Sequence, residues 1–171
     1  EKSYFLSTSG RCGPVVLDIP MDIQKADVNV ETLVGFDGSA FELKYNFQEI
    51  EKKVINFFED LMKSKRPAIL AGGGLRVTNN IERFNSILEK LKIPAFVTWN
   101  GIDVVTSDSD YYGGRVGTYG GPGRNFGIQN TDLLFAIGSR VSGRITGGNV
   151  SSFAREAKKY ITDIFKLLST S

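Results

Sequence analysis

Three groups of small and basic residues each follow a short apolar run of the sequence. The groups are Gly72, Gly73 and Gly74; Thr98, Trp99, Asn100 and Gly101; and Gly138, Ser139 and Arg140, with Arg144 a few residues further on. Glycine allows the backbone to approach a phosphate or a ring closely, and arginine supplies a forked, permanently charged donor for phosphate. Ligands of open parallel sheets bind beyond the carboxyl ends of the strands, so we expect the three groups to face one crevice that suits a nucleotide.

These residues also have a purely structural interpretation, which the sequence leaves open. Gly72–Gly74 could form a strand-to-helix turn that needs unusual backbone angles, and Arg140 and Arg144 could be ordinary solvated charges. Tryptophan is more often a packing residue than a stacking surface for a ligand, so we expect Trp99 to pack.

The glycines after residue 71 do not form one of the common phosphate-binding motifs. No lysine follows them, which excludes a phosphate loop of the Lys-Ser/Thr type, and Val77 stands at the third-glycine position of the dinucleotide fingerprint. Thr98 stands where an acidic residue would hold a ribose. The sequence therefore disfavours a free-standing NAD-type domain, and the lack of histidine disfavours a deacylase-like one.

Composition narrows the possible sites and partners. The 171 residues include no histidine and one cysteine, Cys12, so we expect no metal site, no disulfide and no catalytic residue in this chain. Its 21 basic and 19 acidic residues are scattered, which predicts no nucleic-acid partner, and the Gly/Arg run at 113–124 is not expected to bind RNA. No run is apolar enough to span a membrane and no signal pattern is present, so we expect a cytoplasmic protein.

The apolar periodicity predicts alternating strands and helices. Strands are expected at 15–19, 68–71, 95–98, 133–137 and 160–164, and helices at 47–61, 81–91 and 152–158. Asn46 with Glu49 is expected to cap the first long helix, and Asn80 the second. Residues 111–127, rich in glycine, are expected to form a loop, and residues 21–45 a connecting arm. The alternation predicts an α/β fold, a Rossmann-like parallel sheet with helices on both faces.

Several segments resemble the thiamine diphosphate-dependent enzymes of the acetolactate synthase kind. Residues 10–22, GRCGPVVLDIPMD, are similar to the G-R-x-G-P-V-x-x-D-I-P-x-D stretch that closes the pyrimidine-binding domain of that family. Residues 66–74 and 93–101 resemble the first two strands of its central domain, 112–120 its glycine-rich loop, and 130–147 its third strand and arginine loop. The likeness covers nearly the whole chain, in the family's order.

The resemblance implies a site for FAD or ADP. In acetolactate synthases this central domain binds FAD, which takes no redox part in the reaction, while other members bind ADP or nothing. The positions that match flavin contacts are Gly72, Gly73, Gly74, Thr98, Gly117, Gly120, Gly138, Arg140 and Arg144. Three places depart from the family: Thr118-Tyr119 replace Met-His, Ser142-Gly143 replace paired aspartates, and Trp99 stands where an aliphatic residue is usual.

The resemblance also divides the chain and puts the catalytic centre outside it. Residues 1–25 would be the carboxyl end of the pyrimidine-binding domain, 26–45 a linker, and 46–171 the central domain. The family's activating glutamate would precede residue 1 and its Mg²⁺-binding Gly-Asp-Gly motif would follow residue 171, so thiamine diphosphate and Mg²⁺ would bind in the remaining domains of the parent enzyme.

For the parent, the resemblance implies a homodimer or homotetramer that cleaves or joins the bond beside the carbonyl of a 2-oxo acid, as a lyase or a transferase. The fragment alone is expected to be inactive. The alternative is a non-catalytic structural or oligomerisation domain that has lost its nucleotide.

Overall fold

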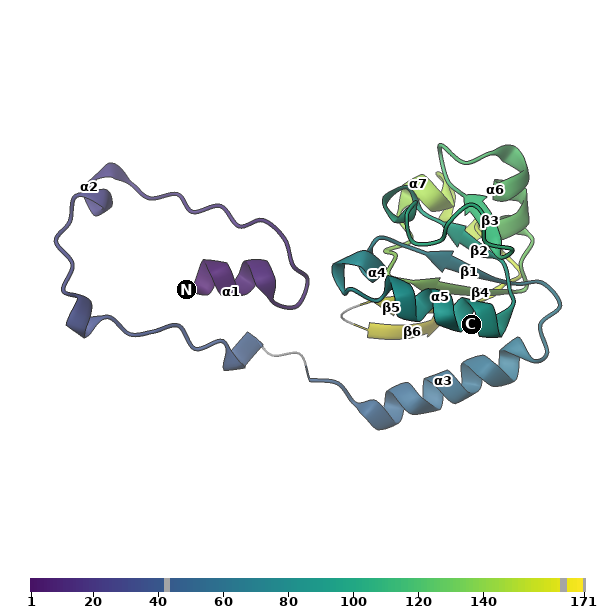
Figure 1. Ribbon diagram of the computed structural model, residues 1–171, viewed down its shortest axis with the longest axis horizontal. Helices are drawn as coiled ribbons and strands as arrows, with labels where there is room; N and C mark the ends of the chain where they lie inside the picture. Colours follow the sequence, from purple (N-terminus) through teal and green to yellow (C-terminus); the bar gives the residue numbers. More distant parts are fainter. Residues whose placement is uncertain (42–43, 164–165, 171) are drawn as a thin grey trace. The chain divides into compact units, whose positions relative to one another are not determined.

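The computed structural model describes residues 1–41, 44–163 and 166–170, and it divides the chain into two compact units, Glu1–Tyr45 and Asn46–Ser171. The first unit consists of short helices joined by irregular chain (Figure 1). These helices are α1 (Lys2–Thr8), α2 (Met21–Gln24), η1 (Val30–Thr32) and η2 (Ser39–Phe41).

A cluster of three aromatic rings joins the two ends of the first unit. The ring of Phe5 lies 5.4 Å from that of Phe36 and 6.2 Å from that of Phe41, between centroids. The carboxylate of Glu1 also accepts a hydrogen bond of 2.7 Å from the backbone N–H of Phe36. Gly38 leaves space for this cluster, because a Cβ at this position would lie 2.5 Å from the Phe5 ring.

The prediction of a strand at 15–19 is wrong. This segment has no regular structure, and the side chain of Val16 is 89% exposed. A strand is stabilised by the hydrogen bonds of a neighbouring strand. The described part of the first unit contains none, so the apolar run alone does not form one.

The second unit is built on a six-stranded sheet in the order β3-β2-β1-β4-β5-β6 (Figure 1). The strands are β1 (Pro67–Ala71), β2 (Ala95–Val97), β3 (Tyr112–Arg115), β4 (Leu133–Ile137), β5 (Lys158–Asp163) and β6 (Lys166–Thr170). The first five are parallel, and β6 runs antiparallel to β5. The predicted α/β fold is therefore confirmed, and the predicted strands at 68–71, 95–98, 133–137 and 160–164 correspond to β1, β2, β4 and β5, with Ile164 outside the described residues.

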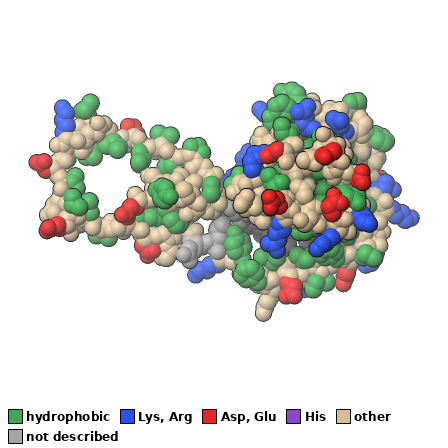
Figure 2. All heavy atoms as spheres, in the orientation of Figure 1, with side chains coloured by type: hydrophobic (Ala, Val, Ile, Leu, Met, Phe, Trp, Pro, Cys, Tyr) green, Lys and Arg blue, Asp and Glu red, His purple; other side chains and the backbone are tan. Residues whose placement is uncertain are grey.

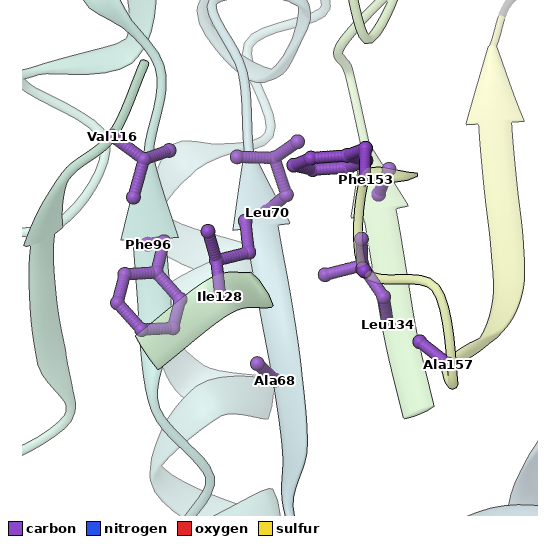
Figure 3. Packing of buried hydrophobic residues seen from close by; sticks show 10 residues of the cluster. Ala68, Leu70, Phe96, Val116, Ile128, Leu134, Phe153 and Ala157 are labelled. Atoms are coloured by element: carbon purple, nitrogen blue, oxygen red, sulfur yellow. The ribbon is translucent and has the colours of Figure 1, made fainter. Parts of the chain in front are cut away.

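Side chains of β1 alternate between the two faces of the sheet, as expected for a strand covered on both sides. Ala68 and Leu70 enter one apolar cluster, together with Phe96 and Ile128, the latter from α6 (Pro122–Gln129) (Figure 3). Ile69 and Ala71 enter the other cluster, with side chains of three helices that cover the opposite face. These helices are α3 (Phe47–Leu61), α4 (Gly74–Val77) and α5 (Ile81–Leu91).

The two long helices begin at the expected cap residues, although only one of these residues caps its helix with a side-chain hydrogen bond. The side chain of Asn46 accepts a hydrogen bond of 3.2 Å from the N–H of Glu49 at the start of α3. Asn80 occupies the N-cap position of α5, as expected, and its carbonyl accepts a hydrogen bond of 2.9 Å from the N–H of Phe84. Its side chain makes no capping hydrogen bond, because the amide instead donates to the carbonyl of Thr78, at 2.9 Å.

Residues 111–127 are not the loop that their glycine content predicts. They contain β3 and most of α6, separated by a short turn. Gly113 lies against the ring of Phe96, and a Cβ added to Gly113 would be 3.0 Å from that ring. Glycine at this position therefore permits β3 to pair with β2. Pro122 occupies the first turn of α6, a position that suits its fixed φ and missing N–H.

The helix expected at 152–158 is also absent. Residues 150–152 form a single turn, η4 (Val150–Ser152), and residues 153–156 form a further turn before β5, with Phe153 and Ala154 buried and Arg155 and Glu156 exposed. Ala154 is fully buried and has a φ of +43°, which a helix cannot accommodate. Its N–H is satisfied by the side-chain oxygen of Gln129, at 2.7 Å.

Basic and acidic side chains are intermixed on the face of the second unit shown in Figure 2. The described residues include no helix long and apolar enough to cross a membrane.

A carboxylate on α3 attaches this helix to the sheet. Asp60 accepts a hydrogen bond from the hydroxyl of Tyr160 and forms an ion pair of 2.6 Å with Lys158, both on β5. The hydrogen bond from Lys158, followed by that from Tyr160, lowers the pKa of Asp60 below its ordinary value. The ionised carboxylate therefore stabilises the fold.

We expect the second unit to lose this stabilisation in acid. Because the folded pKa of Asp60 is depressed, its contribution is present above about pH 4 and is lost as the pH falls through the folded pKa. At neutral pH, Asp60→Asn should reduce the free energy of unfolding by about 1 kcal/mol. Thermal unfolding is then followed from neutral pH to about pH 3, and acid should destabilise the Asp60→Asn variant less than it destabilises the unmodified chain. The matched control is Glu59→Gln, an exposed neighbour on the same helix. Equal acid destabilisation in Asp60→Asn and the unmodified chain would contradict this role.

Candidate functional site

The carboxyl ends of β1, β2 and β4 meet, as the sequence predicts. The N–H of Gly74, after β1, donates to the carbonyl of Gly138, after β4, at 2.9 Å. The N–H of Thr98, after β2, donates to the carbonyl of Ala71 at 3.0 Å. Five of the predicted contact positions, Gly72, Gly73, Gly74, Thr98 and Gly138, therefore come together at this edge of the sheet.

The glycines at this edge pack directly against backbone. A Cβ on Gly72 would lie 2.7 Å from the carbonyl carbon of Gly138, and one on Gly74 would lie 2.8 Å from its Cα. Gly138 has a φ of +62°, which L side chains rarely adopt. Gly101 also lies against this backbone, because a Cβ added to it would be 2.9 Å from the carbonyl oxygen of Ala71. These glycines thus have a structural role, whatever they contact in addition.

The turn after β3 is a second part of the site. Gly117 has a φ of +98°. Its N–H donates to the side-chain oxygen of Asn125 at 2.8 Å, and the side-chain amide of Asn125 donates to the carbonyl of Gly117 at 3.0 Å. The N–H of Gly120 closes the turn on the carbonyl of Gly117, at 2.9 Å. Asn125 was not among the predicted positions, because nothing in the sequence indicates that an asparagine of α6 fixes this turn.

The turn is bonded to the arginine loop, and a cavity opens between them. Both the N–H and the hydroxyl of Thr118 donate to the carbonyl of Arg144, at 2.9 and 3.1 Å. The cavity has a volume of about 250 Å³. Its lining residues are Gly117, Thr118, Asn125, Ile128, Gln129, Arg144, Ile145, Thr146 and Gly147. Gly117, Gly120 and Arg144 therefore form the second group of predicted residues that the fold brings together.

The two arginines keep their charges exposed. Arg144 lies in α7 (Gly143–Thr146), and Arg140 lies in the loop that follows Gly138. Within the described ranges neither guanidinium forms an ion pair. Both charges are thus accessible to an anionic ligand, which their sequence positions alone do not establish.

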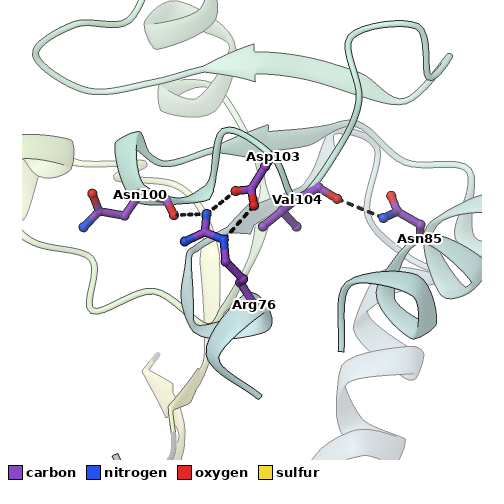
Figure 4. A network of polar contacts seen from close by, with 5 residues as sticks. All are labelled: Arg76, Asn85, Asn100, Asp103 and Val104. Carbon is purple, nitrogen blue, oxygen red and sulfur yellow. Dashed lines mark hydrogen bonds and ion pairs between the residues drawn. The ribbon is translucent and has the colours of Figure 1, made fainter. Parts of the chain in front are cut away.

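A polar network that sequence reasoning missed holds the loop after β2 (Figure 4). Arg76, on α4, donates to the carboxylate of Asp103, at 2.6 Å from Nε, and to the carbonyl of Asn100, at 3.0 Å. The hydrogen bond from Arg76 lowers the pKa of Asp103. The amide of Asn85 donates to the carbonyl of Val104, at 2.9 Å, and holds the same loop next to Asp103. No periodicity or motif links these residues, so only the fold reveals them.

Trp99 is not the packed residue that the sequence predicts. It begins η3 (Trp99–Gly101), and 54% of its side chain is exposed.

Among the described residues, no group of three or more His, Cys, Asp and Glu side chains is placed to hold a metal ion.

Comparison with known proteins identifies the family. Residues 54–164 match the model of the thiamine pyrophosphate enzyme central domain; thiamine pyrophosphate is another name for thiamine diphosphate. The chain belongs to this family. The matched range includes every strand of the parallel sheet and all nine predicted contact positions.

Relatives of this chain are acetolactate synthases, several of them named as large subunits. The chain is 33% identical over 163 residues to isozyme 2 of Escherichia coli (strain K12), covering 95% of the chain and 28% of that protein. It is 31% identical over 170 residues to a probable large subunit of Methanocaldococcus jannaschii, covering 95% and 27%. For the chloroplastic enzyme of Arabidopsis thaliana, the identity is 31% over 166 residues, covering 96% and 24%. The chain thus spans about a quarter of the length of these relatives, and the expected acetolactate synthase-like family is confirmed.

The glycine contact at the sheet edge can be tested by adding one methyl group. Gly72→Ala should reduce the free energy of unfolding by about 2 kcal/mol or more, because the new Cβ meets backbone that cannot move without separating β1 from β4. Gly123→Ala is the matched control: its Cβ meets nothing within 4 Å in α6, so it should stabilise the chain by about 0.5 kcal/mol. Denaturant unfolding measures both, and a neutral Gly72→Ala would contradict the close approach.

Proposed function

We propose that this chain is the nucleotide-binding central part of a thiamine diphosphate-dependent, acetolactate synthase-like enzyme. Its parent cleaves or joins the bond beside the carbonyl of a 2-oxo acid. When bound, thiamine diphosphate supplies a nucleophilic ylid and an electron sink for this chemistry, and both it and Mg²⁺ bind in domains outside this chain. The names of the relatives support the activity, and the family match supports the cofactor.

The same proposal assigns the parts of the chain. Residues 1–25 are the carboxyl end of the pyrimidine-binding domain, 26–45 the linker, and 46–171 the central domain. The division of the chain after Tyr45 and the family match from residue 54 are compatible with this assignment. A cytoplasmic, homodimeric or homotetrameric parent, and an inactive isolated chain, belong to the proposal as well.

The carboxyl edge of the sheet offers a place for FAD or ADP. The observation that carries this proposal is the cavity lined by Gly117 and by Arg144, an exposed arginine that forms no ion pair in the described part of the chain. Arg144 and Arg140 would hold the phosphates. The N–H of Gly74 would not, since it already bonds to Gly138. The predicted glycines therefore shape the site, and the arginines supply its charge.

One observation favours a second candidate, a structural domain without a nucleotide. Gly72, Gly74 and Gly138 are fully explained by the backbone contacts that they make with one another. In that case the domain would only organise the multimer, and neither FAD nor ADP would raise its melting temperature, because only a ligand of the folded form stabilises it.

The binding proposal predicts that FAD or ADP stabilises the 171-residue chain and that this effect depends on Arg144. At a ligand concentration one hundred times the dissociation constant, the stabilisation should be about 2.7 kcal/mol. Arg144→Gln should weaken binding about tenfold by removing a charged hydrogen bond to phosphate. Arg83→Gln, an exposed arginine on α5, is the control and should bind as the unmodified chain does. Thermal unfolding and calorimetry measure these effects, and the absence of any stabilisation by either nucleotide would favour the structural domain.

A further inference from the structure

Helix α3 lies on the outside of the second unit and carries apolar side chains on two of its sides (Figure 1). Phe57 is buried in the apolar cluster beneath the helix. Ile55, Phe58 and Met62, the residue that ends the helix, recur at steps of three and four residues and are all exposed, Met62 to 85%. Because a helix turns by about 100° per residue, these three side chains are centred on the side that points away from Phe57. We call them the α3 stripe.

Charged side chains border the α3 stripe. Lys52, Glu59 and Lys63 lie on one flank of the helix by their spacing, and Glu51 stands one turn before Ile55. Within the described ranges none of these four charges forms an ion pair. An apolar stripe with charges along its side is typical of a helix that pairs with another helix, where the charges select the partner and its orientation.

The α3 stripe is complementary to a second copy of itself in antiparallel orientation. A two-fold axis beside the middle of the helix, level with the bond between residues 56 and 57, places Ile55 opposite Phe58 of the second copy. The charged flanks of the two copies then face each other. With the helical rise per residue, Lys52 lies about 3 Å from the level of Glu59 of the second copy, measured along the helix.

The charges also discriminate between the two possible orientations. In the antiparallel pair, Lys63 stands about 1.5 Å from the level of Glu51 of the second copy, so both lysines meet carboxylates. In a parallel pair, the charged flank would face the opposite flank of the other helix, where Val54 stands, and the charges would stay unpaired. Helix dipoles likewise favour the antiparallel arrangement.

We propose that the α3 stripe binds a second copy of this chain, with the two α3 helices antiparallel. The apolar side chains are removed from water, and the two kinds of lysine–glutamate pair fix the orientation. Three apolar side chains per copy cover less than the about 800 Å² per partner of a standard interface, so the dissociation constant should be about 100 µM. This inference does not depend on nucleotide binding, and it assigns a surface to self-association.

Sedimentation equilibrium of the 171-residue chain measures this association. Between about 5 µM and about 1 mM, the average mass should rise from that of one chain toward that of two, as a dissociation constant of about 100 µM requires. Ile55→Lys should weaken association at least about tenfold, because it puts a charge into the apolar contact. The matched control is Phe126→Lys, which adds the same charge at an exposed apolar residue of α6 and should leave association unchanged.

Charge reversals test whether the partner is a second copy. Lys52→Glu and Glu59→Lys should each weaken self-association about fivefold, because each brings like charges together across the two-fold axis. An equimolar mixture of the two variants should associate again, since each pair between the unlike copies then joins opposite charges. Failure of the mixture to associate more strongly than either variant alone would overturn the antiparallel arrangement.

The remaining outcomes identify what else could cover the stripe. A chain that stays monomeric at the highest concentration overturns the proposal. Denaturant unfolding of Ile55→Lys then shows whether the stripe is covered within the chain, which would lower the free energy of unfolding, or is left to a different partner. Association that is unchanged in Ile55→Lys would overturn the proposal as well, because another surface would carry it. Circular dichroism verifies that each variant is folded, and Met62→Lys decides the question if Ile55→Lys does not fold.

Discussion

The site depends on the close approach of two loop backbones, one after β1 and one after β4. Gly72 and Gly74 lie against Gly138 with no space for a side chain between them. Because β1 and β4 are hydrogen-bonded neighbours in the centre of the sheet, this contact continues their pairing beyond the last strand residues. The loop after β2 joins the same point through Gly101. The backbone thus fixes where the loops lie, while side chains on them such as Trp99 and Arg140 remain exposed.

The fold could be predicted where apolar periodicity was strong and failed where tertiary contacts override local preference. Residues 68–71 and 133–137 form continuous buried strands, and their pattern is unambiguous. The two glycines of β3 resemble a loop in the sequence, but the ring of Phe96 lies where a side chain of Gly113 would be, and the side chain of Arg124 lies where one of Gly114 would be. Conversely, residues 15–19 have a strand-like composition but no strand beside them in their unit. Which strand pairs with which depends on the whole fold, so a local sequence pattern does not predict it.

For the candidate site, sequence reasoning located the edge but not its chemistry. Residues after parallel strands meet at one edge by geometry, so Gly72, Thr98 and Gly138 could be placed together in advance. The roles of their backbone groups could not, because the hydrogen bonds that use them join residues far apart in the chain. The same holds for Arg76 and Asp103, whose ion pair crosses between α4 and the loop after β2.

The antiparallel strand β6 has a consequence for how the sheet can grow. The register runs from Asp163 opposite Lys166 to Lys159 opposite Thr170, so the outer edge of β5 is occupied along most of its length. An exposed strand edge is a template on which another chain can add a strand. Here a parallel strand could join β5 only by displacing β6. Strand β6 therefore covers this edge of β5, and its removal would expose backbone N–H and C=O groups with which another strand could pair.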